Sequence, residues 1–226
     1  MGKKELANLL SLVSIISPIL LIYSGSILYV AFDESFYHKE FEKLNVYSAL
    51  SSYDINAINQ KVLQFLSGKN NELPGDFFTQ REISHLQDVE EIFSIIISTF
   101  FISLVSLVLS FAILILIIRD KRIMLRFFDR IFLMAALIVI AINLILILAL
   151  NVDFGASFDI FHKSFFNEGS YLFSPLSEKI VVLYPEQMFY DGGIRILKYS
   201  FSISLIIVLM GITVYALERW KLKKSL

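Results

Sequence analysis

The chain has 226 residues, of which 56% are hydrophobic and 18% are charged. This composition is too apolar for a soluble domain of this size. The apolar residues fall in four blocks, each long enough to cross a hydrocarbon core, which takes roughly 20 helical residues. The net charge of −1 gives no bulk field that would attract nucleic acid. Without cysteine, no disulfide links the loops and no thiol acts as nucleophile or metal ligand.

The first apolar block, residues 6–32, follows a short basic start and predicts a membrane-spanning helix kinked at Pro18. A cleaved signal peptide is the alternative, but the block is longer than the ~7–15 residues of a signal core. In the polar segment that follows, apolar side chains recur near one helical face over residues 36–53. Asp54 is placed to cap the start of a second helix over Ile55–Leu66.

Thr79 and Glu82 have the spacing of a capping box. They predict a helix that begins near Gln80 and runs without a break into the second apolar block, residues 92–118. The third block, residues 131–150, follows a short basic loop.

The second polar segment, residues 151–195, is rich in phenylalanine and tyrosine. Within it we expect short strands at residues 171–173 and 179–184, with a turn at residues 168–170. The fourth block and a basic tail complete the chain.

Short segments beside the apolar blocks hold 11 of the 20 lysines and arginines. By the positive-inside rule these segments are cytoplasmic, which puts both chain ends inside and both longer polar segments outside. We therefore expect an all-α polytopic membrane protein, a four-transmembrane-helix bundle with a small mixed α/β extracellular cap formed by two loops. The expected segments are the cytoplasmic N-terminus and first span (1–32), the first extracellular segment (33–91), the second span (92–118), the basic cytoplasmic loop (119–130), the third span (131–150), the second extracellular segment (151–195), the fourth span (196–217) and the basic cytoplasmic tail (218–226).

All three histidines lie in the predicted extracellular segments. His38 has charged neighbours and fits a solvated surface position. On a helix, Glu82 and Asp88 lie three residues to either side of His85, on neighbouring parts of one face. A carboxylate bonded to one ring nitrogen fixes the tautomer and raises the basicity of the other nitrogen, as in a catalytic imidazole. An interfacial helix of mixed charge has the same spacing, so both interpretations stay open.

His162 lies among four phenylalanines, twelve residues after the third span and at the expected depth of lipid headgroups. An aromatic interfacial anchor is the alternative interpretation of this cluster. Asp159 precedes His162 by three residues, which repeats the spacing of Glu82 and His85. Two such pairs are reminiscent of carboxylate-bridged di-metal bundles. The pairs lie outside the spans and no span adds a carboxylate, so we expect no metal.

The middles of the four spans contain no Asp, Glu, Lys, Arg or His. Ionisable groups inside a membrane usually mark ion or proton pathways, so a pump or ion-coupled transporter is disfavoured. Asn143, in the third span, is expected to make an interhelical hydrogen bond. The absence of a Gly-x-Ser-x-Gly elbow disfavours a serine hydrolase. Chemistry is therefore expected at the outer interface.

Three motifs flank the spans, and they are Glu82-x-x-His85-x-x-Asp88-Val89, Phe161-His162-x-x-Phe165-Phe166 and Leu183-Tyr184-Pro185-Glu186-x-x-Phe189. In their order and in their placement relative to four spans, they resemble the lipoprotein intramolecular transacylase (Lit) family of Gram-positive bacteria. The resemblance covers most of the chain. Tyr171 is a departure, because a tryptophan is expected in the aromatic stretch after the second histidine, and it leaves the acyl-chain preference open.

The resemblance implies a membrane acyltransferase whose substrate is a diacylglyceryl lipoprotein in the bacterial cell membrane. The sn-2 acyl chain would move to the α-amino group of the N-terminal cysteine, giving an N-acyl, monoacylglyceryl (lyso-form) lipoprotein. Ester to amide is downhill, so no cofactor is expected. The active site would lie at the extracellular interface, in contact with membrane lipid.

Catalytic roles carry over from the family to His85 and His162. Our hypothesis makes His85 the general base, held by Glu82 or Asp88, while His162 stabilises the oxyanion or protonates the leaving oxygen. A two-step route through an acyl-imidazole at either histidine stays open. Asp159 is a further supporting candidate, and the candidate substrate-binding residues are aromatic: Phe161, Phe165, Phe166, Tyr171 and Tyr184.

Two other classes of function are compatible with the residues alone. A non-catalytic membrane protein would bind a lipid or a partner through its aromatic outer segments. A metal-dependent membrane hydrolase would use the carboxylate and histidine pairs as ligands.

Overall fold

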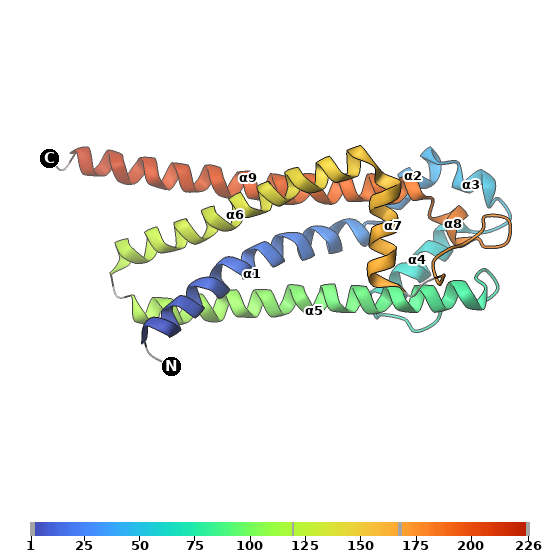
Figure 1. Ribbon diagram of the computed structural model, residues 1–226, viewed down its shortest axis with the longest axis horizontal. Coiled ribbons are helices and arrows are strands. Elements are labelled where there is room, and N and C mark those ends of the chain that lie inside the picture. The colour runs from blue at the N-terminus through green and yellow to red at the C-terminus, as the bar shows by residue number, and fades with distance from the viewer. Residues whose placement is uncertain (1–2, 119, 167–168, 225–226) are drawn as a thin grey trace. The chain divides into compact units, whose positions relative to one another are not determined.

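The computed structural model describes residues 3–118, 120–166 and 169–224, and within these ranges the chain forms helices joined by turns, without a strand (Figure 1). The helices in chain order are α1 (Lys3–Ala31), α2 (Glu34–Lys43), α3 (Val46–Ala49), α4 (Ile55–Leu66), α5 (Gln80–Ile117), α6 (Lys121–Val152), α7 (Phe154–Phe165), α8 (Ile180–Leu183) and α9 (Glu186–Lys224). Among the residues named in the predictions, Arg119 of the basic loop and Glu168 of the expected turn lie outside the described ranges.

Four of the described helices, α1, α5, α6 and α9, are long and apolar enough to cross a membrane. The predicted all-helical, multi-pass architecture is thus confirmed. The chain divides into two compact units. We call Met1–Ser26, Ser98–Leu146 and Ile196–Leu226 the apolar unit, and Ile27–Ile97 with Ile147–Arg195 the histidine unit.

The apolar unit exposes many large aliphatic side chains and buries small and polar ones. Leu116 and Met210 are 80% and 64% exposed, whereas Ala136 and Asn143 are fully buried. Water would penalise this distribution, but lipid does not, and small residues between helices let the backbones approach closely. The helix α1 continues through Pro18 within this unit.

The histidine unit has an aromatic and aliphatic core drawn mainly from α2, α3, α4, α5 and α8. Phe41, Val46 and Leu183 in this core are almost fully buried. Two predicted helix starts are confirmed here. Asp54 accepts a hydrogen bond from the Ala57 backbone amide at the start of α4.

The second of these starts is the capping box of α5. The Glu82 amide donates to the Thr79 hydroxyl, and the Thr79 amide donates to the Glu82 carboxylate. From this box α5 runs without interruption to Ile117, as the sequence predicts.

The helix expected over residues 36–53 is interrupted. Asn45 has a φ of 58°, in the left-handed region that asparagine tolerates better than most residues. The chain turns there, and two shorter helices, α2 and α3, replace the single expected one.

The strands expected at residues 171–173 and 179–184 are wrong. Residues 180–183 form one turn of helix, α8, and residues 169–179 are turns and irregular chain. Side chains satisfy the backbone here instead of a neighbouring strand: Arg81 donates to the carbonyl groups of Gly169 and Leu172, and Glu178 accepts from the Ser174 amide. The expected mixed α/β cap is therefore helical in the described part of the chain.

Candidate active site

The first turns of α5 position His85. Glu82, fully buried one turn earlier, accepts from the Thr79 amide at 2.6 Å and from the Ile180 amide at 2.7 Å. The same carboxylate therefore begins α5 and anchors the N-terminal end of α8 to it. His85 follows on the next turn and is 8% exposed, with an Nδ1 atom that has no hydrogen-bond partner in the described chain.

The helix α7 positions His162. Asp153 caps this helix by accepting from the Ala156 amide. The Nδ1 atom of His162 lies 2.7 Å from the Phe158 carbonyl oxygen. A carbonyl only accepts, so Nδ1 must carry the proton, and in the neutral ring Nε2 has the free lone pair.

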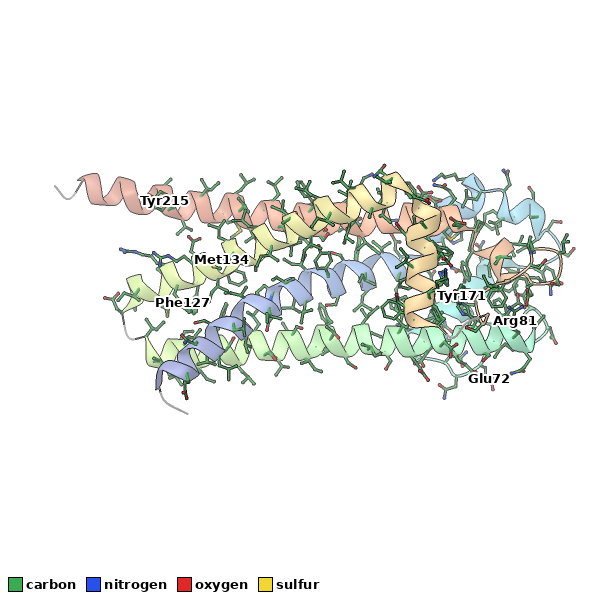
Figure 2. All side chains as sticks on the ribbon, in the orientation of Figure 1. Glu72, Arg81, Phe127, Met134, Tyr171 and Tyr215 are labelled. Carbon is green, nitrogen blue, oxygen red and sulfur yellow. The ribbon has the colours of Figure 1, made fainter. Side chains whose placement is uncertain are left out.

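The two imidazoles face each other, although 77 positions separate them in the sequence. Their ring centroids are 6.3 Å apart and their planes differ by 18°. Phe166 contacts both rings, at 4.7 Å from His85 and 5.4 Å from His162. Phe173 covers His85 at 5.2 Å and Tyr171, labelled in Figure 2, covers His162 at 5.0 Å. The pair is thus enclosed by aromatic rings.

His85 lies in the charged N-terminal part of α5. With 38 residues, α5 is about 57 Å long, which exceeds a hydrocarbon core of about 30 Å. The uncharged part of α5 begins only at Ile92. Burial, followed by the electrostatic effect of His162 and of Arg81, lowers the pKa of His85 to about 4. His85 is therefore neutral at physiological pH.

The carboxylates expected beside the histidines make no hydrogen bond to either imidazole in the described chain. Both Glu82 oxygens are occupied by backbone amides. Asp88 has no hydrogen bond or ion pair within the described ranges, and Asp159 pairs with Lys163 one turn along α7. The hydrogen bond expected between a carboxylate and His85 is therefore not formed. Across the residues that the structure describes, no group of three or more acidic and histidine side chains could hold a metal ion.

The predicted aromatic site residues divide into two groups. Phe166 and Tyr171 contact the histidine pair, and Phe161 contacts His162 at 5.5 Å. Phe165 packs on Phe161 at 5.0 Å and is 59% exposed. Tyr184 lies apart from them and packs against the hydrophobic core, where it contacts the Tyr37 and Phe41 rings and donates to Asn59.

Three further residues at the pair were not among the predicted site residues. Phe158 contacts His162 at 4.1 Å, Phe173 contacts His85, and Arg81 stacks over Phe173 at 4.8 Å. A sequence signal exists for two of them, because Arg81 and Phe158 each precede a histidine by one helical turn. Phe173 has no such signal, because an irregular segment brings it to His85.

Comparisons with known proteins agree on one family. A sequence model of the lipoprotein intramolecular transacylase Lit matches residues 12–189. Among the curated proteins no sequence matches significantly.

Three solved structures of the membrane-integral Lit protein from Bacillus cereus share the fold. One matches with a TM-score of 0.77 at 21% identity, over 99% of both chains. Two variants of that protein, with a histidine replaced by arginine or by alanine, match with TM-scores of 0.77 and 0.73 at 19% and 21% identity. The arginine variant aligns over 97% of this chain and 96% of its own, and the alanine variant over 99% and 96%.

The family suggested by the three sequence motifs is thus confirmed by a match over most of the chain. It makes the protein an enzyme and removes the non-catalytic alternative. The chain belongs to the lipoprotein intramolecular transacylase family of membrane acyltransferases.

Proposed function

We propose that the protein moves the sn-2 acyl chain of a diacylglyceryl lipoprotein to the α-amino group of the lipoprotein's N-terminal cysteine. The product has one O-acyl and one N-acyl chain. The reaction would take place at the extracellular face of a bacterial cell membrane, with both chain ends in the cytoplasm. The positive-inside rule supports this orientation, because the segments rich in lysine and arginine adjoin the other ends of the spans.

The observation that carries the proposal is the face-to-face pair of His85 and His162, enclosed by aromatic rings. Acyl transfer from an ester to an amine needs a base for the ammonium proton, a donor for the oxyanion and an acid for the leaving alkoxide. Two imidazoles 6.3 Å apart can place one group on each side of a reacting carbonyl.

The contacts favour roles opposite to those expected from the sequence. His162 donates its Nδ1 proton to a carbonyl, so its Nε2 atom is available as general base. His85 has a lowered pKa and no carboxylate partner, which makes it a weak base. A neutral imidazole in such a site can act instead as an electrophile, with its N–H group directed at the oxyanion.

The steps balance without a further reactant. The α-ammonium group, whose ordinary pKa is near 8, releases one proton to water, and the neutral amine attacks the ester carbonyl while His162 takes the second proton from the attacking nitrogen. His85 donates a hydrogen bond to the resulting oxyanion. When the carbon–oxygen bond breaks, the protonated His162 gives its proton to the glyceryl oxygen. Because amine and ester belong to one molecule, the enzyme must mainly hold them about 3–3.5 Å apart.

Exposed aromatic residues on α7 suit the substrate's acyl chains. Phe161 and Phe165 are 44% and 59% exposed and adjoin the pair through Phe166. Membrane lipid or a substrate acyl chain would cover such apolar surface favourably.

Expression in a bacterium that makes diacylglyceryl lipoproteins but lacks this activity tests the proposal. The N-terminal lipopeptide of one lipoprotein is fragmented by mass spectrometry, because the rearrangement leaves the total mass unchanged. We expect an N-acyl fragment with the wild type and with His38→Ala, an exposed histidine bonded to Tyr47. The fragment should disappear in His85→Ala and His162→Ala at equal protein level. An N-acyl product that persists in both variants contradicts the proposal.

A further inference from the structure

The irregular segment between α7 and α8, residues 169–179, covers the histidine pair. Its Tyr171 and Phe173 rings contact His162 and His85, respectively. The segment contains a short internal turn. In this turn the Ser174 amide donates to the Glu178 carboxylate, and the Glu178 amide donates to the Ser174 carbonyl. With no helix or strand in residues 169–179, contacts to other elements must hold the two rings in place.

Arg81 supplies the contacts that hold this segment on α5. One guanidinium nitrogen donates to Glu178 at 2.7 Å, and the other donates to the Gly169 and Leu172 carbonyl groups at 2.7 and 2.6 Å. The guanidinium also lies 4.8 Å from the centre of the Phe173 ring. Figure 2 labels Arg81 and, in the attached segment, Tyr171.

The geometry of these contacts requires an arginine. A guanidinium presents its donors in a fixed planar fork and stacks on an aromatic face, so one side chain reaches the carboxylate, two carbonyls and the ring together. A lysine ammonium keeps the charge but is a single point with no planar face. The Glu178 side chain is 10% exposed and the Arg81 side chain 46%, so only the carboxylate end of this ion pair is shielded from water.

We propose that Arg81 and Glu178 close residues 169–179 over the histidines, and that this closure directs the acyl group to the amine instead of to water. The inference rests on the proposed function. An activated ester next to a base is open to hydrolysis whenever water reaches it, and closed sites suppress that side reaction. His85 and His162 are only 8% and 9% exposed while the segment is in place. Arg81 is a positioning residue, because it acts through Phe173 and the segment.

The competing reaction gives a product that is distinct from the normal one. Water adds to the ester carbonyl, the bond to the glyceryl oxygen breaks, and a fatty acid and a glyceryl hydroxyl result. The lipoprotein then has a free amine and lacks one acyl chain. Transfer conserves the mass of the lipopeptide, whereas hydrolysis lowers it by one acyl group in exchange for a hydrogen.

The test compares Arg81→Gln, Arg81→Lys and Glu178→Gln with the wild type and with Lys69→Gln, an exposed residue elsewhere in the histidine unit. The assay is the one described for the proposed function, with the intact mass of the lipopeptide added. We expect the mass-deficient, free-amine product to rise at least tenfold as a share of all products in Arg81→Gln and Glu178→Gln. Arg81→Lys should give an intermediate rise, and Lys69→Gln should match the wild type.

Each outcome decides the inference. If the variants accumulate to wild-type level and yield only N-acyl product or unreacted substrate, the closure does not control water access and the inference is overturned. Should Arg81→Gln fail to accumulate, Glu178→Gln decides, because its amide keeps an oxygen for the Ser174 amide. A wild type that forms no N-acyl product overturns the proposed function itself, and the inference with it.

Discussion

The two units of the chain are stabilised by different kinds of polar contact. In the apolar unit, the hydrogen bonds that join the middles of the helices connect uncharged groups: Ser14 bonds Ser110, and Tyr23 and Ser200 both bond Asn143. In the histidine unit, ion pairs connect segments that are distant in sequence: Arg195 with Asp33, Lys43 with Asp191, and Arg81 with Glu178.

The difference follows from the two surroundings. An unpaired charge inside a hydrocarbon core is costly. The spans therefore use hydroxyl and amide groups, and hydrogen bonds between such groups contribute little to the free energy of unfolding. Where water solvates them, charged groups cost little free energy. Their protonation then depends on pH, and the strength of their ion pairs depends on salt. Titratable chemistry therefore belongs to the histidine unit. Changes of pH and salt should therefore alter the stability of contacts in the histidine unit and leave contacts in the apolar unit unchanged.

The largest effect is expected at Glu82, a fully buried carboxylate that accepts two backbone amides. Glu82→Ala would leave the amides of Thr79 and Ile180 without this acceptor, and the Ile180 amide lies in a buried site. We expect a loss of about 3–5 kcal/mol, since each hydrogen bond to a charged group contributes about 1.5–3 kcal/mol. Thermal unfolding in detergent measures it. The exposed Glu91→Ala is the matched control, and equal midpoints for the two variants would contradict the structural role of Glu82.

The pH dependence of stability should reveal His85. Its folded pKa of about 4 lies below the ordinary value of about 6.5. The stability that the neutral His85 ring contributes is therefore fully present above pH 6.5 and is lost as the pH falls towards 4. In this interval the unfolded chain binds a proton at His85 and the folded chain does not. We expect a loss of up to about 3 kcal/mol.

The comparison that isolates this contribution is between the wild type and His85→Phe, each unfolded at pH 7 and at pH 4.5. The phenylalanine variant should lose less stability over this interval, because it lacks the titrating ring. Identical losses would show that His85 is not the group that destabilises the fold in acid.

A smaller effect is expected from the ion pair of Arg195 and Asp33, whose side chains are 27% and 20% exposed. Arg195→Gln should cost about 1 kcal/mol, and high salt should reduce the difference from the wild type. The more exposed pair of Asp159 and Lys163 serves as comparison, and Asp159→Asn should have almost no effect. Unfolding at 50 mM and 1 M salt measures both. A cost for Arg195→Gln that does not change with salt would contradict an electrostatic origin.

Local sequence patterns were sufficient to predict several features. The four apolar blocks are continuous runs of sequence, and the Asp54 cap and the box of Thr79 and Glu82 depend on residues within one helical turn; all are present in the structure. The family followed from the order of three motifs around the spans.

Contacts between residues far apart in sequence could not be predicted in this way. Glu82 has the spacing to bond His85 but instead bonds the Ile180 amide, 98 positions away. Arg81 donates to the Gly169 and Leu172 carbonyl groups, so a side chain 88 or more positions away, and not a neighbouring strand, bonds this aromatic segment. Tyr184 is a predicted substrate-binding residue, yet the fold packs it against the hydrophobic core, away from the histidine pair. In each case a partner far away in the sequence determines which contacts the residue makes.

The smallest effect is expected at Asn143, which the sequence singled out and which lies fully buried in the apolar unit. Its Oδ1 atom accepts from Tyr23 at 3.0 Å and from Ser200 at 3.1 Å, while its Nδ2 group has no partner in the described chain. Asn143→Leu removes that unsatisfied donor. The two hydroxyl groups keep other acceptors, the carbonyl groups of Val139 and Leu197.

We therefore expect Asn143→Leu to cost less than about 1 kcal/mol, near the average of about 0.6 kcal/mol for hydrogen bonds between membrane helices. The cost should be the same at pH 7 and pH 4.5 and at low and high salt, because no group in the contact carries a charge. Unfolding of Asn143→Leu, Tyr23→Phe and the double variant measures the coupling between the two side chains. A cost above about 2 kcal/mol, or one that changes with pH, would mean that Asn143 supports a charged group, and the distinction between the two units would then fail.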